Sequence, residues 1–240
     1  MASKPTAILH IALTVLLLGA CSTRVGPHGQ QTNRFDPRYL AKSDIDRVVD
    51  TNRAEIVAGF RRVAEKLYKR NPKEWKKAGQ PSVEAAVQRL FAGSIDFPEL
   101  EGRREGAAVL YAFSAGYQGD RVMALMAGLL GMTYAAFEGK DDFYMLDDLS
   151  EQKLYNCARN IEIAIWKLSS TKISGNDFLL VSNELDPGNQ NLSFEREFGR
   201  VIGLLDVLSK IVADKNGRAI TRMTQSVATA VFLPVSALGF

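Results

Sequence analysis

Histidine is nearly absent from this chain. The 240 residues contain two histidines, His10 and His28, and none follows His28. Serine and cysteine nucleophiles usually need a neighbouring histidine as their base, and zinc sites usually need histidine or clustered cysteine. The rest of the chain therefore lacks the residues for a Ser-His or Cys-His pair and for the common zinc sites.

Cysteine and net charge are also low. Cys21 and Cys157 are the two cysteines, which excludes the disulfide framework of small secreted domains. The formal net charge of +3 is far from that of a strongly basic nucleic-acid-binding domain, so we predict no nucleic-acid partner. The apolar fraction of 46% and the charged fraction of 24% are typical of a globular domain that depends on its hydrophobic core.

The N-terminal residues follow the order of a secretory signal peptide. Lys4 supplies a positive charge, residues 7–18 form an apolar run, and small residues follow it. This run is too short to cross about 30 Å of hydrocarbon as a helix, which disfavours an uncleaved membrane anchor. We predict that residues 1–20 are a signal peptide, cleaved between Ala20 and Cys21.

The stretch Leu18-Gly19-Ala20-Cys21 resembles the lipobox of bacterial lipoproteins. The resemblance covers this segment alone. It implies that the Cys21 thiol receives a diacylglyceryl group and that the freed amine is acylated, for example with palmitate. Two or more acyl chains hold a protein stably on a membrane. The residue after the cysteine is Ser22 and not aspartate. In lipoproteins of Gram-negative bacteria, this implies an anchor in the outer membrane, with the body in the periplasm. An ordinary cleaved signal is the alternative.

The residues that follow the predicted lipid site have the composition of a tether. Residues 21–40 include Gly26-Pro27 and Asp36-Pro37 and carry little that a core would bury. Such segments behave as flexible connectors. We predict that residues 41–240 form one all-helical domain with an apolar C-terminal tail.

Apolar residues recur at helical spacing through most of this domain. They lie three or four positions apart in residues 45–67, 154–168 and 194–212, which is typical of amphipathic helices that pack against other helices. Residues 122–137 are apolar on nearly every side, as expected of a helix at a domain centre. We predict an all-α fold of six to eight helices packed around residues 122–137.

Basic residues gather around the end of the first predicted helix. Asn71-Pro72 ends that helix because proline disfavours the α conformation in the residue before it. Asn71 is then placed to cap a short helix that begins at Pro72. The surrounding cations suit contact with anionic lipid head groups, lipopolysaccharide phosphates or an acidic partner, or they are a solvated helix face. The candidates for anionic contact are Arg61, Arg62, Lys69, Arg70, Lys73, Lys76 and Lys77.

Residues 139–151 are acidic. They lack the alternating ligands and central glycine of an EF-hand loop, so a calcium site is not indicated, although cation binding by residues 141–151 stays open. Two carboxylates across a cleft would suit hydrolysis of cell-wall glycan, but the sequence does not select a pair. The simplest interpretation is that the acids lie at the start of a helix near Asp147, where the helix dipole favours them. We predict no metal site and no catalytic residue.

The sulfur-containing side chains lie in apolar patterns. Cys157 falls on the apolar stripe of its predicted helix, which favours a buried and inert thiol. Met123, Met126 and Met132 either fill the core or line a cavity for a hydrophobic ligand.

The C-terminal tail has no charged residue after Arg222. Its Pro234 and small residues argue against a membrane-spanning helix. The tail either folds back onto the body or serves as an exposed docking segment for a membrane neighbour.

Three functions of different classes are compatible with these patterns. The first is a non-catalytic envelope lipoprotein that acts as a scaffold or assembly factor, with outer-membrane lipid and an envelope protein as partners and no cofactor besides the lipid on Cys21. The second is a carrier of a hydrophobic ligand, and the third is a carboxylate-dependent glycan hydrolase. The lipobox, the missing histidines, the basic helix and the apolar tail favour the first. Oligomeric state stays open.

Overall fold

The computed structural model describes residues 42–93, 96–144, 147–174, 177–183, 191–217, 220 and 231–236. The predicted signal peptide, Cys21 and the whole predicted tether lie outside these ranges. Contacts divide the chain into two units, Met1–Ser43 and Asp44–Phe240, and every element named below belongs to the second unit.

Helices account for most of the described residues, which confirms the prediction of an all-α fold. The described ranges contain seven α-helices: α2 (Asp44–Arg70), α3 (Pro72–Lys77), α4 (Val83–Leu90), α5 (Glu105–Ala112), α6 (Arg121–Ala136), α7 (Glu151–Ser170) and α8 (Ser193–Asn216). The smaller elements are the 3₁₀ turn η2 (Pro98–Leu100) and an antiparallel hairpin of β1 (Lys172–Ser174) and β2 (Asp177–Phe178).

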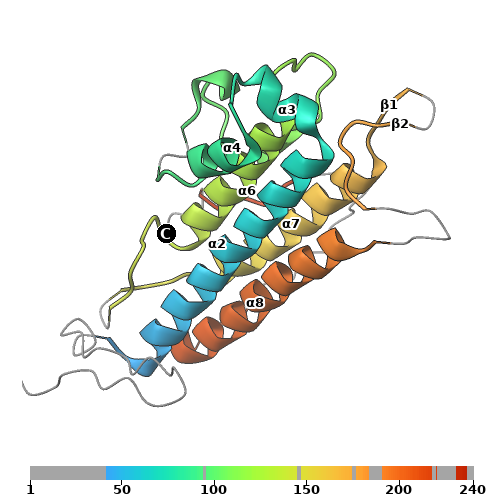
Figure 1. The fold of residues 1–240 in the computed structure, drawn as a ribbon. Coiled ribbons are helices and arrows are strands. Elements are labelled where there is room, and N and C mark those ends of the chain that lie inside the picture. Colours follow the sequence, from blue (N-terminus) through green and yellow to red (C-terminus); the bar gives the residue numbers. More distant parts are fainter. Residues whose placement is uncertain are drawn as a thin grey trace, which may run out of the picture. The chain divides into compact units, whose positions relative to one another are not determined.

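The four long helices α2, α6, α7 and α8 form an antiparallel bundle (Figure 1). Around the bundle, α2 packs on α8, α8 on α7, α7 on α6, and α6 on α2. Two contacts at each interface show that the neighbouring helices run antiparallel, because the residue number rises along one helix as it falls along the other. The contacts are Arg62–Glu197 and Lys66–Ser193 between α2 and α8, Arg159–Asp206 and Glu151–Asn216 between α7 and α8, Thr133–Cys157 and Glu138–Lys153 at the α6–α7 interface, and Tyr68–Asp120 and Asp50–Phe143 at the α2–α6 interface. The chain therefore has the up-down-up-down order of a four-helix bundle.

The central position predicted for the most apolar helix is confirmed. Fourteen of the sixteen residues of α6 are buried. The helix α5 lies directly on it, and a Cβ atom added at Gly128 would lie 2.6 Å from the carbonyl oxygen of Glu105. Gly128 is therefore the residue that allows the backbones of α5 and α6 to approach this closely.

The prediction that α7 begins near Asp147 was wrong. The helix begins at Glu151, and the Ser150 hydroxyl caps it by accepting a hydrogen bond from the Lys153 backbone N–H at 3.3 Å. Asp147 instead accepts hydrogen bonds from the Lys140 ammonium group and, at 2.9 Å, from the Tyr144 backbone N–H. Because these bonds fold Asp147 into the preceding loop, it does not serve the helix terminus.

Residues 231–236, here called the C-terminal segment, fold back onto α7. The Asn160 side chain donates to the Leu233 carbonyl at 2.8 Å and accepts from the Leu233 N–H at 2.7 Å. Asn156 donates to the Pro234 carbonyl at 2.8 Å, and Val235 is buried. For this part of the tail, folding back onto the body is thus confirmed. The side-chain amides of α7 pair with the segment's backbone much as a neighbouring strand would.

Candidate functional site

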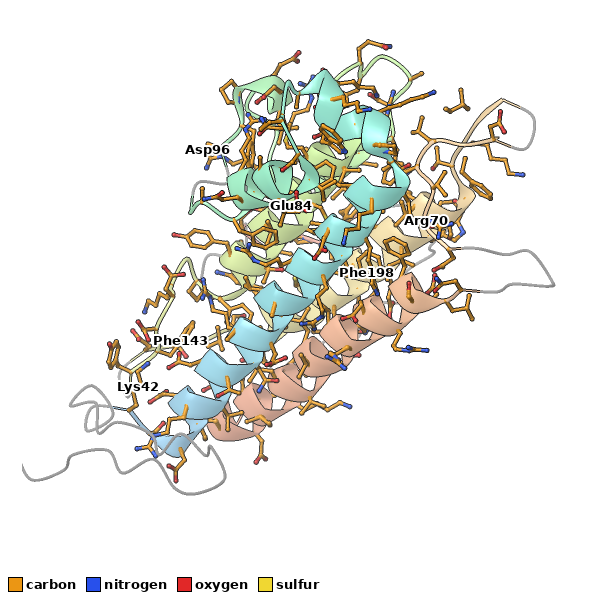
Figure 2. The ribbon with its side chains drawn as sticks, in the orientation of Figure 1. Lys42, Arg70, Glu84, Asp96, Phe143 and Phe198 are labelled. Carbon is orange, nitrogen blue, oxygen red and sulfur yellow. The ribbon has the colours of Figure 1, made fainter. Side chains whose placement is uncertain are left out.

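A pocket of about 660 Å³ lies where the end of α2, α3, the loop between α5 and α6, and the β1–β2 hairpin meet. We call it the corner pocket. The hairpin and α3 lie at the same end of the bundle (Figure 1), and Arg70 is seen at the end of α2 on the side of the hairpin (Figure 2). Its volume is within the usual range of ligand sites.

Asn71 positions one wall of the pocket against the other. Its side-chain amide donates to the Val181 carbonyl at 2.8 Å and accepts from the Val181 N–H at 2.8 Å. It also donates to the Leu67 carbonyl, at 2.8 Å, at the end of α2. Asn71 does stand at the cap position of α3, as predicted, but its side chain makes no cap hydrogen bond. The oxygen that a cap needs is already bonded to Val181.

The described residues that line the corner pocket are mostly cationic where they are charged. The carboxylate among them is Glu74, and the five cations are Arg70, Lys73, Lys77, Arg121 and Lys172. Two of these cations, Arg121 and Lys77, already bind groups of the same chain. The Arg121 guanidinium donates to the carbonyls of Ala112, at 2.6 Å, and Ser114, at 2.8 Å, and to that of Tyr117.

The Lys77 ammonium nitrogen lies 2.7 Å from a carboxylate oxygen of Glu74 and partly neutralises that carboxylate. Lys73 is exposed and has no ion-pair partner among the described residues. Lys172, on the opposite wall, is exposed beside the Phe178 ring, with its ammonium 5.5 Å from the ring centroid. The lining of the pocket therefore contains more cations than carboxylates.

Apolar side chains lie between these cations. Phe113 and Phe178 are half-buried in the lining. Ile173 and Val181 also line it and are 67% and 41% exposed, which places them among the most exposed large apolar residues of the described chain. Exposed aliphatic side chains gathered beside cations make this pocket a candidate binding site.

A buried polar network at the N-terminus of α6 shares Glu74 and Arg121 with the pocket lining. Glu74 accepts a hydrogen bond from the Arg121 backbone N–H at 2.8 Å, and Asp120 accepts one from the Met123 N–H at 2.9 Å. The Tyr68 hydroxyl donates to Asp120 at 2.9 Å. Burial, together with the nearby charge of Glu74, raises the pKa of Asp120 to about 6 although these hydrogen bonds act to lower it. Two carboxylates thus satisfy the first N–H groups of α6.

The structure separates the seven predicted anion-contact residues. Arg70, Lys73 and Lys77 come together in the corner pocket. The other four make separate contacts: Arg61 lies over the Phe91 ring at 4.5 Å, Arg62 pairs with Glu197 at 2.9 Å, Lys69 pairs with Glu65, and Lys76 lies over the Trp75 ring at 5.3 Å.

Sequence analysis did not identify Lys172, Ile173 or Val181 as site residues. They lie about a hundred positions from α3 in the sequence, where the local pattern indicates a turn at residues 169–175 and leaves residues 178–181 open between a strand and a buried loop. Nothing in that stretch distinguishes a pocket wall from an ordinary loop. The available signal was the amide of Asn71, which can bind a distant backbone as readily as a helix N-terminus.

The acidic residues of 139–151 are used in structural contacts. Asp141 pairs with Arg53 of α2, and Glu151 accepts a hydrogen bond from Asn216 of α8 at 3.2 Å. The contacts of Asp141 and Glu151 hold the loop against the bundle. Within the described ranges, no three residues among His, Cys, Asp and Glu gather as a metal ion would require.

The sulfur atoms of the core are enclosed. Cys157 is fully buried, and burial raises the pKa of its thiol to about 12, so it is not a reactive nucleophile. Met123, Met126 and Met132 are at most 1% exposed and belong to the lining of neither pocket described here. They fill the core.

A second pocket, of about 550 Å³, lies between α7 and α8. Its described lining has balanced charge: Arg159 and Lys210 oppose Asp206 and Asp214. Arg159 binds both oxygens of Asp206, at 2.8 and 2.9 Å. This ion pair joins the two helices and leaves little unbalanced charge for a ligand.

Comparison with protein-family models, with curated proteins and with solved structures finds no match. Among the described helices, none combines the length and the apolar character that a membrane crossing needs. The corner pocket is therefore the feature from which function is inferred.

Proposed function

We propose that this chain is a non-catalytic lipoprotein of the cell envelope that acts as a scaffold or assembly factor for an envelope complex. In this proposal Cys21 carries the lipid after cleavage behind Ala20, and Ser22 directs the protein to the outer membrane. The helical body then lies in the periplasm and binds a protein partner.

The observation that supports partner binding is the corner pocket. It brings lysine side chains of α3 and β1 together with exposed aliphatic side chains, and Asn71 ties the end of α2 to the segment that follows the hairpin. Interfaces gain energy from apolar anchors and selectivity from complementary charge.

The other functions have less support in the described residues. A carrier would need an apolar cavity, whereas the methionines of α6 are packed in the core. A hydrolase would need two carboxylates free to act across a cleft. Glu74 is held by Lys77 and Arg121, and Asp206 is held by Arg159.

Chemical crosslinking in native membranes, followed by affinity purification, tests the proposal. The natural chain is compared with Cys21→Ala, which cannot receive the lipid. We expect a defined envelope complex with the natural chain and its loss with Cys21→Ala. If no protein is recovered and mass spectrometry detects a bound lipid instead, the scaffold is refuted in favour of a carrier. Equal recovery with both forms refutes the anchoring role of Cys21.

A further inference from the structure

We infer that two copies of this chain associate by exchanging the C-terminal segment, so that residues 231–236 of each copy lie on α7 of the other. The groove that holds the segment within one copy then holds the same residues of its neighbour. Exchange of this kind is a low-cost route to a dimer, because the contacts of the closed monomer are made again between the two chains. The association goes beyond the proposed function and requires no envelope partner.

The groove on α7 contains polar groups that need an occupant. Asn156 and Asn160 lie one turn apart on α7 and are 2% and 0% exposed. Their side chains bind the backbone of Leu233 and Pro234 through three hydrogen bonds of 2.7 to 2.8 Å. A buried amide group without a partner is costly, so an empty groove is unfavourable, whichever copy supplies the segment.

The groove also fits the side chains of this particular segment. Leu233 and Val235 are 9% and 1% exposed. Phe232 packs on α5, where Gly106 leaves room for its ring, since a Cβ atom at Gly106 would lie 2.8 Å from that ring. A second copy carries the same apolar side chains at the same spacing from the backbone that the two asparagines bind. It therefore fits the groove without any change in the contacts.

The chain that leads to the segment is longer than closure onto its own body requires. The end of α8 lies beside the start of α7, where Asn216 donates to Glu151 at 3.2 Å. Asn160 lies further along α7 by about 14 Å of helix axis, and the helix itself is about 10–12 Å wide. Residues 218–230 could span up to about 45 Å when extended. The surplus length allows the segment to reach α7 of an adjacent copy.

The segment can leave its groove while the four long helices stay packed. Its attachment includes the three asparagine hydrogen bonds and the burial of two side chains. Release returns backbone freedom to six residues and exposes their polar groups to water, which offsets much of that attachment. Local release of this kind needs no global unfolding, and it is the step that exchange requires.

Photo-crosslinking from position 232 tests the exchange in cells that produce the full chain. The test variant carries p-azidophenylalanine in place of Phe232, which keeps an aromatic ring at the contact with α5. The control variant carries the same residue in place of Val207, which is 53% exposed on α8. After irradiation, denaturing gels separate monomer from dimer, and mass spectrometry of two isotope-labelled chains locates the adducts between copies.

We expect several-fold more covalent dimer from position 232 than from position 207, with the adduct beside Gly106 of the other copy. Adducts confined to monomers would show that each copy keeps its own segment and would overturn the exchange. An adduct between position 232 and a different protein would also overturn it, in favour of a groove for a partner's segment. A dimer from position 207 alone would place the interface on α8 instead.

Two single-cysteine variants test the exchange without the photo-crosslinker. Gly106→Cys and Phe232→Cys are produced together on separate chains and treated with a mild oxidant. A Cβ atom at Gly106 would lie 2.9 Å from the Cβ atom of Phe232, so small adjustments bring the pair to the roughly 3.5–4.5 Å of a disulfide.

The matched control pairs Phe232→Cys with Gly116→Cys. Gly116 is exposed, and among the described residues no atom lies within 4 Å of a Cβ atom added there. We expect disulfide-linked dimer from the Gly106 pair and its loss in the Gly116 pair. Equal amounts of dimer from the two pairs would indicate chance collision and would count against the exchange.

Discussion

Replacing Asn160 with alanine should detach the C-terminal segment from α7. Asn160 is fully buried and makes two hydrogen bonds to the backbone of Leu233. Each bond contributes about 1 kcal/mol net, and a buried group left without a partner costs about 1–3 kcal/mol. If the segment stayed in place, the Leu233 N–H and carbonyl would both lose their partner, for a total cost of about 2–6 kcal/mol.

The segment can instead detach from α7. On release, its backbone groups regain hydrogen bonds to water, and the loss is then the burial of Leu233 and Val235, about 1.5–3 kcal/mol for each side chain. The conformational freedom that the released residues regain, about 1–2 kcal/mol per residue, offsets part of this loss. Phe232 also contacts α5, where a Cβ on Gly106 would lie 2.8 Å from its ring. We therefore expect a loss of about 3 kcal/mol in the free energy of unfolding and local release of the segment.

Hydrogen exchange by mass spectrometry and urea unfolding together measure both effects. Exchange in residues 231–236 should accelerate strongly in Asn160→Ala while exchange in α6 changes little. Asn156→Ala, which removes one bond to the segment, at the Pro234 carbonyl, and one from Gln152 within α7, is the matched control and should cost about 1–2 kcal/mol. Unchanged exchange of the segment in Asn160→Ala, or a larger effect from Asn156→Ala, would refute the assigned role of Asn160.

Three further predictions follow from buried contacts. Because the pKa of Asp120 rises from 3.8 to about 6 on folding, the native state binds this proton more tightly than the unfolded chain, and stability from this group falls as pH rises from 4 to 6. The unfolding free energy of Asp120→Asn relative to the natural chain should thus rise by about 2 kcal/mol between pH 4 and pH 7, and a difference independent of pH would contradict this. Gly128→Ala should destabilise by at least about 2 kcal/mol because its Cβ would meet backbone of α5, whereas Gly131→Ala, whose Cβ has 3.5 Å of room, should be neutral or stabilising in thermal unfolding. Asn71→Ala should loosen the segment that follows the hairpin and speed hydrogen exchange at Val181, and unchanged exchange there would count against the role of the Asn71 side chain in holding that segment.

The helices of this fold could be predicted from the sequence because each carries a regular apolar pattern. The stripe through Leu154, Cys157 and Ile161 predicts α7, and the unbroken apolar run predicts that α6 is central. The order of helices around the bundle could not be predicted in the same way. It depends on which stripes pair, and all of them have similar spacing and composition.

Helix ends were less predictable than helices, for a reason visible at Asp147 and Asn71. Short polar side chains bind any suitable backbone group nearby, so the same residue type suits a cap, a loop or a distant strand. Asp147 bonds within its loop, and Asn71 bonds across 110 positions to Val181. Only the tertiary arrangement decides between these partners.

The candidate site was partly predictable, and the limit lies within one short helix. Three and four positions separate Lys73 from Lys76 and Lys77, so helical geometry makes Lys73 a near neighbour of both on α3. The sequence therefore does not say which of these lysines meets the hairpin. In the structure Lys73 and Lys77 line the corner pocket with Lys172, whereas Lys76 lies over the Trp75 ring. The contacts at this end of α2 include the bonds of Asn71 to Val181, 110 positions away, and such a long-range contact leaves no signal in the local sequence pattern.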